Sequence, residues 1–151
     1  MEVTVFQHGF VQMPGGIAVR LPADLAQLFV LRSLAATLAI RQDFDLDAVE
    51  DVKLAVDEMC SAVTIRAKPG ELLICEFLAR DGRVDVAVTT LSEVDEPISQ
   101  DTFGWLVLTT LTDSVSSWTT PDPSGGYRIF AMLSVKRPGR HGVVGSPGGT
   151  V

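Results

Sequence analysis

Residues 46–67, LDAVEDVKLAVDEMCSAVTIRA, form the longest stretch of the chain with an unbroken helical pattern. Apolar residues recur at steps of three and four, and charged residues fall on the opposite face, which is the pattern of a helix packed on one side. An aspartate at 45 or 47 can cap the start of this helix, and Lys68-Pro69-Gly70 ends it. The apolar stripe consists of Val49, Val52, Val56, Met59, Cys60 and Val63.

Glu58 is the residue of this helix that most suggests chemistry. It shares a row with Leu54 and Ala62, one and two helical turns apart, along the border of the apolar stripe. A glutamate at such a border is more often a solvated or hydrogen-bonded residue than a catalyst, so the structural and catalytic interpretations both remain open.

The segments after this helix have the pattern of a sheet. Residues 71–79 and 83–90 alternate and are joined by Arg80-Asp81-Gly82, which predicts a hairpin. An acidic loop with Pro97 follows over 91–101, where Glu93, Asp95 and Glu96 form a solvated lid. Asp101 can then cap a third helix over 102–113, in which Trp105 is a core residue. Two further strands are expected at 115–119 and 127–135, separated by a turn.

The segments before the helix indicate an arm, a strand and a first helix. Residues 1–16 form an N-terminal arm, 17–21 an edge strand closed by Pro22, and 23–40 an amphipathic helix. Residues 17–136 then make one domain, and the Gly- and Pro-rich tail 137–151 is expected to be disordered. This order of elements predicts an α/β (α+β) two-layer sandwich: a mixed, mainly antiparallel sheet with helices on one face.

Composition excludes several classes of function. With 19 acidic and 12 basic residues, the chain has a formal net charge of −7, which argues against direct nucleic-acid binding. It has neither a signal-peptide pattern nor an apolar run long enough for a membrane span, so we expect a soluble cytoplasmic protein. Cys60 and Cys75 are expected to be small buried residues in a reducing compartment, and His8 and His141 suggest no metal site.

The run DVKLAVDEMC at 51–60 resembles the N-box helix of the RsbW-type anti-sigma factors, which are protein-serine kinases of the histidine-kinase-like ATPase superfamily. The similarity includes Leu21-Pro22-Ala23, and the stretch 103–115, where the family has its second glycine box. It covers about residues 17–136 and is strongest to divergent actinobacterial members, among them a mycobacterial anti-sigma factor. The resemblance implies the histidine-kinase-like ATPase (Bergerat) fold.

The resemblance also implies a nucleotide site with altered residues. Glu58 matches the family's glutamate that acts as a catalytic base or orients water, whereas Ala62 stands where an asparagine holds magnesium, so no metal ligand is assigned. Thr90 and Ser92 occupy the positions of the adenine-binding aspartate and the glycine after it. The implied site is degenerate and consists of Glu58, Ser61, Thr90, Ser92 and Gly104; it has no certain cofactor and, at most, weak affinity for ATP with magnesium.

By this resemblance the chain is expected to be an anti-sigma factor that sequesters a stress-type RNA polymerase sigma factor. It is expected to form a homodimer and to be relieved by an anti-anti-sigma (STAS-domain) protein. Its status as an enzyme stays open: Ala62 and Thr90 argue for little kinase activity. The alternatives are an active serine kinase that phosphorylates the anti-anti-sigma factor, and a relative that has lost both roles and serves in another complex.

Overall fold

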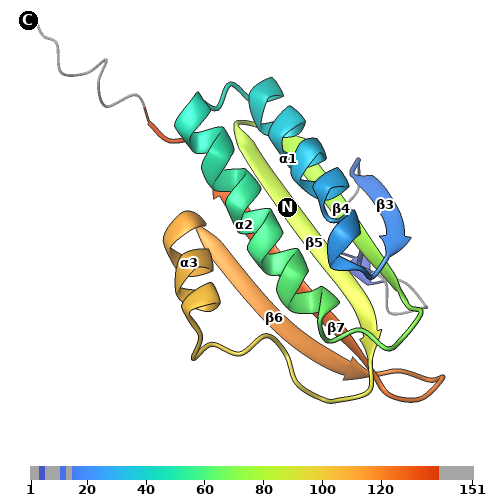
Figure 1. Ribbon diagram of the computed structural model, residues 1–151. Coiled ribbons are helices and arrows are strands. Elements are labelled where there is room, and N and C mark those ends of the chain that lie inside the picture. Colours follow the sequence, from blue (N-terminus) through green and yellow to red (C-terminus); the bar gives the residue numbers. More distant parts are fainter. Residues whose placement is uncertain (1–3, 6–10, 13–14, 140–151) are drawn as a thin grey trace, which may run out of the picture.

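A computed structural model describes residues 4–5, 11–12 and 15–139, and the predicted central helix lies across the middle of it as α2, Leu46–Thr64 (Figure 1). Asp45 is the residue that caps the helix, because its carboxylate accepts a hydrogen bond from the Ala48 N–H at 2.8 Å. The helix ends at Thr64, slightly before the expected Ala67. All six residues of the predicted apolar stripe are buried.

Five strands form the sheet under α2. They are β3 (Ile17–Pro22), β4 (Leu72–Arg80), β5 (Arg83–Ser92), β6 (Ser114–Pro121) and β7 (Tyr127–Lys136). Their spatial order is β3-β4-β5-β7-β6, so β3 lies at one edge as predicted. All four pairings among these strands are antiparallel, so the sheet has no parallel pair within the described chain. The predicted fold class is confirmed, with the sheet more uniform than expected.

The helices cover one face of this sheet, which confirms the predicted two layers (Figure 1). The helix expected over 23–40 is divided: a 3₁₀ turn, η1 (Leu25–Gln27), precedes α1 (Phe29–Arg41). Asp24 caps this 3₁₀ turn, since its side chain accepts a hydrogen bond from the Ala26 N–H at 3.0 Å. Arg32 of α1 then donates to Asp57 of α2 at 2.6 Å, which ties the two helices together.

The third helix, α3 (Phe103–Leu111), begins with a different N-cap from the one expected. Asp101 was the predicted N-cap, but Thr102 occupies that position, and its hydroxyl accepts a hydrogen bond from the Trp105 N–H at 3.1 Å. A helix cap is decided by which side chain reaches the free N–H groups, and both residues are of suitable type. Trp105 packs against the main core, as the sequence predicted.

The opposite face of the sheet is partly apolar. Leu78, Ala87 and Phe130 form a second buried cluster there, and Trp118 stacks on Phe130 with ring centroids 5.3 Å apart. The N-terminal arm contributes a separate two-stranded ladder, β1 (Thr4–Val5) with β2 (Val11–Gln12), and β2 lies against β5. The tail that is predicted to be disordered comprises residues 137–151, of which 140–151 lie outside the described residues.

Among the described residues, no helix has the length and apolar character needed to cross a bilayer. Cys60 and Cys75 are both free thiols with no exposed surface, which confirms the prediction that they are small buried side chains.

Candidate functional site

One face of α2 opens into a cavity of about 320 Å³ between α2, the start of α3 and the loop before it. Glu58, Ser61 and Ala62 of α2 line it, and Gly104 faces them from α3. This cavity, called here the Glu58 cavity, therefore brings together three of the five predicted site residues, with Ala62 beside them. The remaining lining residues are Leu25, Ile65, Arg66, Ile98, Ser99 and Thr102.

Glu58 and Gly104 are in direct contact although they are far apart in sequence. A Cβ built on Gly104 would overlap the Oε2 atom of Glu58 and would lie 3.1 Å from its Cδ atom. Only a residue without a side chain leaves the Glu58 carboxylate its present place against the first turn of α3. The helix N-terminus also carries a partial positive charge, which favours a carboxylate there. The close approach of the Glu58 carboxylate thus explains why residue 104 is a glycine.

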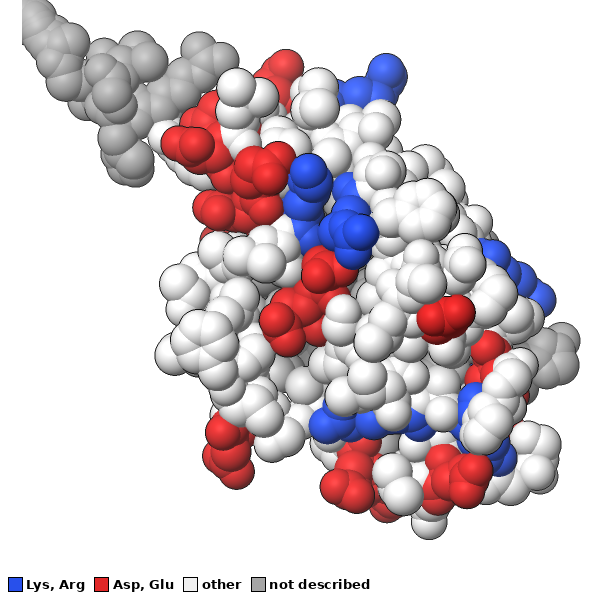
Figure 2. Space-filling view, in the orientation of Figure 1, with Lys and Arg blue, Asp and Glu red and all other residues white. Residues whose placement is uncertain are grey.

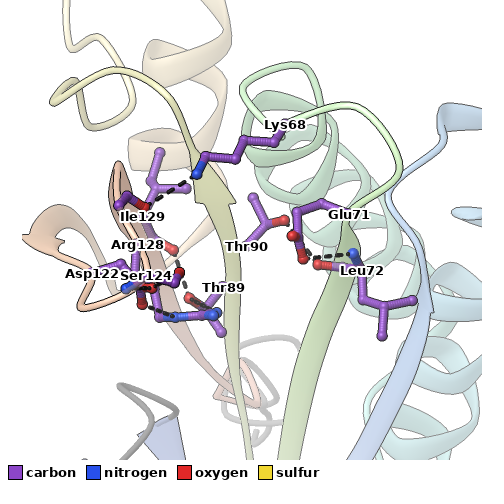
Figure 3. Close-up of polar contacts among 10 residues, drawn as sticks. Lys68, Glu71, Leu72, Thr89, Thr90, Asp122, Ser124, Arg128 and Ile129 are labelled. Atoms are coloured by element: carbon purple, nitrogen blue, oxygen red, sulfur yellow. Dashed lines mark hydrogen bonds and ion pairs between the residues drawn. The ribbon is translucent and has the colours of Figure 1, made fainter.

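Thr90 and Ser92 lie outside this cavity, at the end of β5. Thr90 is fully buried, and its hydroxyl donates to the Leu72 carbonyl at 2.8 Å, as Figure 3 shows. Ser92 is 1% exposed, and its Oγ atom accepts a hydrogen bond from the Val94 N–H. Both residues therefore serve the packing of β5 in this structure.

The turn between β6 and β7 closes over the end of β5. Lys68 reaches across from the loop after α2 and donates to the Gly125 carbonyl at 3.1 Å (Figure 3). In the same turn, hydrogen bonds from Ser124 lower the pKa of the Asp122 carboxyl, and the positive charge of Arg128 acts in the same direction. This polar cluster holds the turn in place at the end of β5.

The acidic loop before α3 is more ordered than the sequence indicates. Ile98 is buried in the main core, and its N–H donates to the Ser117 hydroxyl at 3.0 Å. Thr119 donates to the Asp95 carboxylate, so β6 holds the loop at two points. Ile98 thereby forms one wall of the Glu58 cavity. A large apolar side chain within a polar stretch was the signal for this role, and the interpretation as a solvated lid missed it.

Two further residues near the cavity were not predicted. Arg66 lines the cavity and donates to the Ala62 carbonyl at 2.7 Å. Thr64 lines a neighbouring cavity of about 570 Å³, and its buried hydroxyl has no hydrogen-bond partner in the part of the chain that the structure describes. The two cavities share Leu25 and Ile65 as lining residues. A periodicity argument could not find these roles, because both residues follow the stripe that defines the helix.

Two curated proteins resemble the chain over most of its length. Both are named anti-sigma-F factor RsbW, from Mycobacterium tuberculosis strains CDC 1551 / Oshkosh and ATCC 25618 / H37Rv. Each is 31% identical over 124 residues, which is 80% of this chain and 73% of the relative. The chain belongs to the RsbW family of anti-sigma factors. No family model matches the sequence. The family and the fold class expected from the N-box helix are both confirmed.

By the resemblance, the residue of this RsbW-family chain at the magnesium position is Ala62. The side chain of Ala62 is a methyl group, and its carbonyl accepts the hydrogen bond from the positively charged Arg66 guanidinium. Magnesium requires oxygen ligands in octahedral geometry, and a neighbouring guanidinium repels a cation. The residues at this position do not fit a magnesium ion.

Proposed function

We propose that this RsbW-family chain acts as a binding protein that sequesters a stress-type RNA polymerase sigma factor, with little phosphoryl transfer of its own. The low phosphoryl transfer is supported by the composition of the Glu58 cavity. The predicted base lies beside Gly104, but the residue that the resemblance assigns to the magnesium position is Ala62, whose carbonyl accepts a hydrogen bond from Arg66. Phosphoryl transfer depends on metal positioning and on neutralisation of phosphate charge.

The size of the expected loss can be judged from ordinary interaction strengths. Each charge-assisted contact contributes about 1.5–3 kcal/mol. Absence of both the metal ligand at Ala62 and the adenine acceptor at Thr90 therefore removes roughly 3–6 kcal/mol, or a hundredfold or more in affinity. Thr90 supports this reasoning because its hydroxyl already donates to the Leu72 carbonyl and Thr90 does not line the Glu58 cavity.

The proposal is tested by restoring the missing ligand. Wild-type protein and the variants Ala62→Asn and Glu58→Ala are compared by the change in melting temperature with millimolar ATP and magnesium, since a ligand of the native state must stabilise it. We expect little change for the wild type and a magnesium-dependent rise for Ala62→Asn. Strong magnesium-dependent stabilisation of the wild type, lost in Glu58→Ala, together with phosphate transfer to an anti-anti-sigma protein, would instead establish the kinase alternative.

Sigma-factor binding is supported by exposed apolar side chains on the first strand and the first helical segment. Ile17 of β3, Leu25 of η1 and Phe29 of α1 are 46%, 53% and 53% exposed. Groups of acidic side chains lie on the helix-bearing face (Figure 2). Exposed apolar side chains on a protein with a net charge of −7 suit a partner that also carries a basic, DNA-binding surface.

A pair of exposed apolar residues provides a matched test of this surface. Phe29→Ser is expected to weaken binding to a stress-type sigma factor at least tenfold, because it removes an aromatic anchor. Leu106→Ser is the control, since Leu106 lies on α3 and is similarly exposed, at 58%. Binding is measured by calorimetry against purified stress-type sigma factors. The proposal is wrong if none of them binds the wild type, or if both variants bind equally well.

The same proposal includes two partners and a location. A STAS-domain anti-anti-sigma protein would release the sigma factor, and a second copy of the chain would form a homodimer in the cytoplasm. Light scattering of the purified chain, alone and mixed with a STAS-domain protein, tests both associations. A monomer at tens of micromolar contradicts the homodimer.

A further inference from the structure

Three basic side chains form one transverse row at the end of the sheet where β4 turns into β5. Arg80 lies directly opposite Arg83, and Arg83 lies directly opposite Lys136. Opposed residues of antiparallel strands point to the same side of the sheet, about 5 Å from one another at Cβ. Like charges placed opposite one another are destabilising. The row therefore concentrates positive charge on a protein whose net charge is −7.

The positive charge of this row is poorly neutralised within the described chain. The Nε atom of Arg83 lies 3.9 Å from the Asp85 carboxylate, which is beyond hydrogen-bond length, and this buried atom has no hydrogen-bond partner among the described residues. Arg80 and Lys136 make no side-chain ion pair with the residues that the structure describes. A buried donor without a partner is costly, so an incoming acceptor would be stabilising.

The row lies in a concave site. A cavity of about 310 Å³ is lined by four basic and two acidic residues together with Gly82, the basic ones being Arg80, Arg83, Lys136 and Arg137. Arg137 is fixed at the rim of the cavity, since its guanidinium donates to the Gln42 carbonyl at 3.1 Å and its backbone N–H donates to the Gly82 carbonyl at 2.7 Å. An adjoining hollow of about 230 Å³ shares Arg83 and Asp85 and adds Ser134, whose buried hydroxyl also has no hydrogen-bond partner among the described residues.

We propose that this cavity, called here the β4–β5 basic site, binds a small polyvalent phosphate compound of the pyrophosphate type. A single carboxylate would neutralise only one charge of the row, whereas linked phosphates place several acceptor oxygens against three neighbouring cations. The cavity lies within the size range of small-ligand sites. It shares no lining residue with the Glu58 cavity, so the inference does not depend on the proposed function.

Titration of the full chain with pyrophosphate, in the absence of magnesium and at constant ionic strength, tests the site. We expect pyrophosphate to raise the melting temperature of the wild type. Arg83→Gln and Lys136→Gln should each bind it about tenfold to a hundredfold more weakly, as expected for loss of a charge-assisted contact. Without ligand, Lys136→Gln should melt at or above the wild-type temperature, because like-charge repulsion is reduced, whereas Arg83→Gln also removes the cation beside the buried Asp85 carboxylate. The matched control is Arg20→Gln, an exposed arginine of β3 outside the cavity.

Several outcomes would overturn the inference. These are no stabilisation of the wild type, equal stabilisation of Arg83→Gln and the wild type, or an equal loss in Arg20→Gln. If Arg83→Gln fails to fold, Lys136→Gln decides, since Lys136 is exposed. A glutamate-rich peptide that competes more strongly than pyrophosphate would assign the site to an acidic protein segment and refute a small phosphate ligand.

Discussion

Gly104 and Gly126 both avoid a clash, but the atoms that they would meet differ in freedom to move. A Cβ at Gly104 would meet the end of the flexible Glu58 side chain, whereas a Cβ at Gly126 would lie 2.6 Å from the Ser92 backbone carbonyl. Gly126 also has a φ of 72°, in the left-handed region. The same substitution should therefore have different costs at the two positions.

We expect Gly126→Ala to lower the free energy of unfolding by roughly 2 kcal/mol or more, from backbone strain plus the contact with Ser92. Gly104→Ala should stay within about 1 kcal/mol of the wild type, because alanine is the better helix former and the Glu58 carboxylate can turn away. Urea denaturation of both variants measures the difference. Equal losses would show that the space beside Glu58 is as rigid as the β6–β7 turn.

Cys60 of α2 and Cys75 of β4 place their sulfur atoms 3.8 Å apart in the core. Burial raises the pKa of the Cys75 thiol well above its usual value, and the hydrogen bond with Cys60 adds to the shift. The folded protein thus holds this proton more tightly than the unfolded chain. The corresponding stability is fully present below the unfolded thiol pKa of about 8.5 and is lost as the pH rises further.

We therefore expect the free energy of unfolding to fall from about pH 8.5 to pH 10 in the wild type, and to fall less in Cys75→Ala. The difference between wild type and Cys75→Ala removes the contribution of groups that titrate alike in both proteins. Urea denaturation across this range supplies the measurement, with pH 7 as the reference. Parallel pH profiles would contradict the assignment to Cys75.

At the scale of elements, the start of α3 can be tested directly. Thr102 caps this helix in the structure, whereas its neighbour Asp101 was the residue expected from the sequence. Thr102→Ala should destabilise the protein by about 1 kcal/mol, because the Trp105 N–H loses its acceptor. Asp101→Ala is the control and should stay within about 0.5 kcal/mol. If Asp101→Ala lowered the melting temperature more than Thr102→Ala, the N-cap would be Asp101 and not Thr102.

The loop before α3 shows how tertiary contacts override local composition. Its acidic residues predict a solvated segment, and residues 93–97 are indeed exposed. Ile98 nevertheless enters the core, and hydrogen bonds from Ile98 and Thr119 hold the loop on β6. A single apolar side chain gives no periodicity, so its burial depends on where β6 places Ser117 and Thr119.

At the scale of the whole molecule, the net charge of −7 should govern the kinetics of the proposed partnership. Acidic side chains attract a basic sigma factor over distances comparable with the Debye length, which shortens from about 10 Å to about 5 Å between roughly 0.1 and 0.4 M salt. We expect the association rate to fall about tenfold over that range, with a smaller change in the dissociation rate. Stopped-flow measurements separate the two rates. An association rate independent of salt would exclude electrostatic steering.

Much of the fold could be predicted from local patterns in the sequence. The stripe of α2, the turn at Asp81-Gly82 and the alternation in β5 are local signals with a defined geometry, and each predicted its element within a few residues. Less of the candidate site could be predicted from the sequence. The resemblance pointed to both Glu58 and Gly104, which are in contact, whereas Thr90 and Ser92 lie apart from the cavity because hydrogen bonds and tight packing fix them at the end of β5.

By itself, the sequence determined the family, the two-layer class and the buried face of α2, because these depend on side-chain periodicity and on residues close together in the chain. The tertiary structure alone decided which distant groups meet. Gly104 against Glu58, Arg66 on the Ala62 carbonyl and the basic row Arg80, Arg83 and Lys136 all depend on helix packing or strand register. Such contacts form when separate elements are packed together to bury a common core, and no local pattern specifies the atoms that then become neighbours.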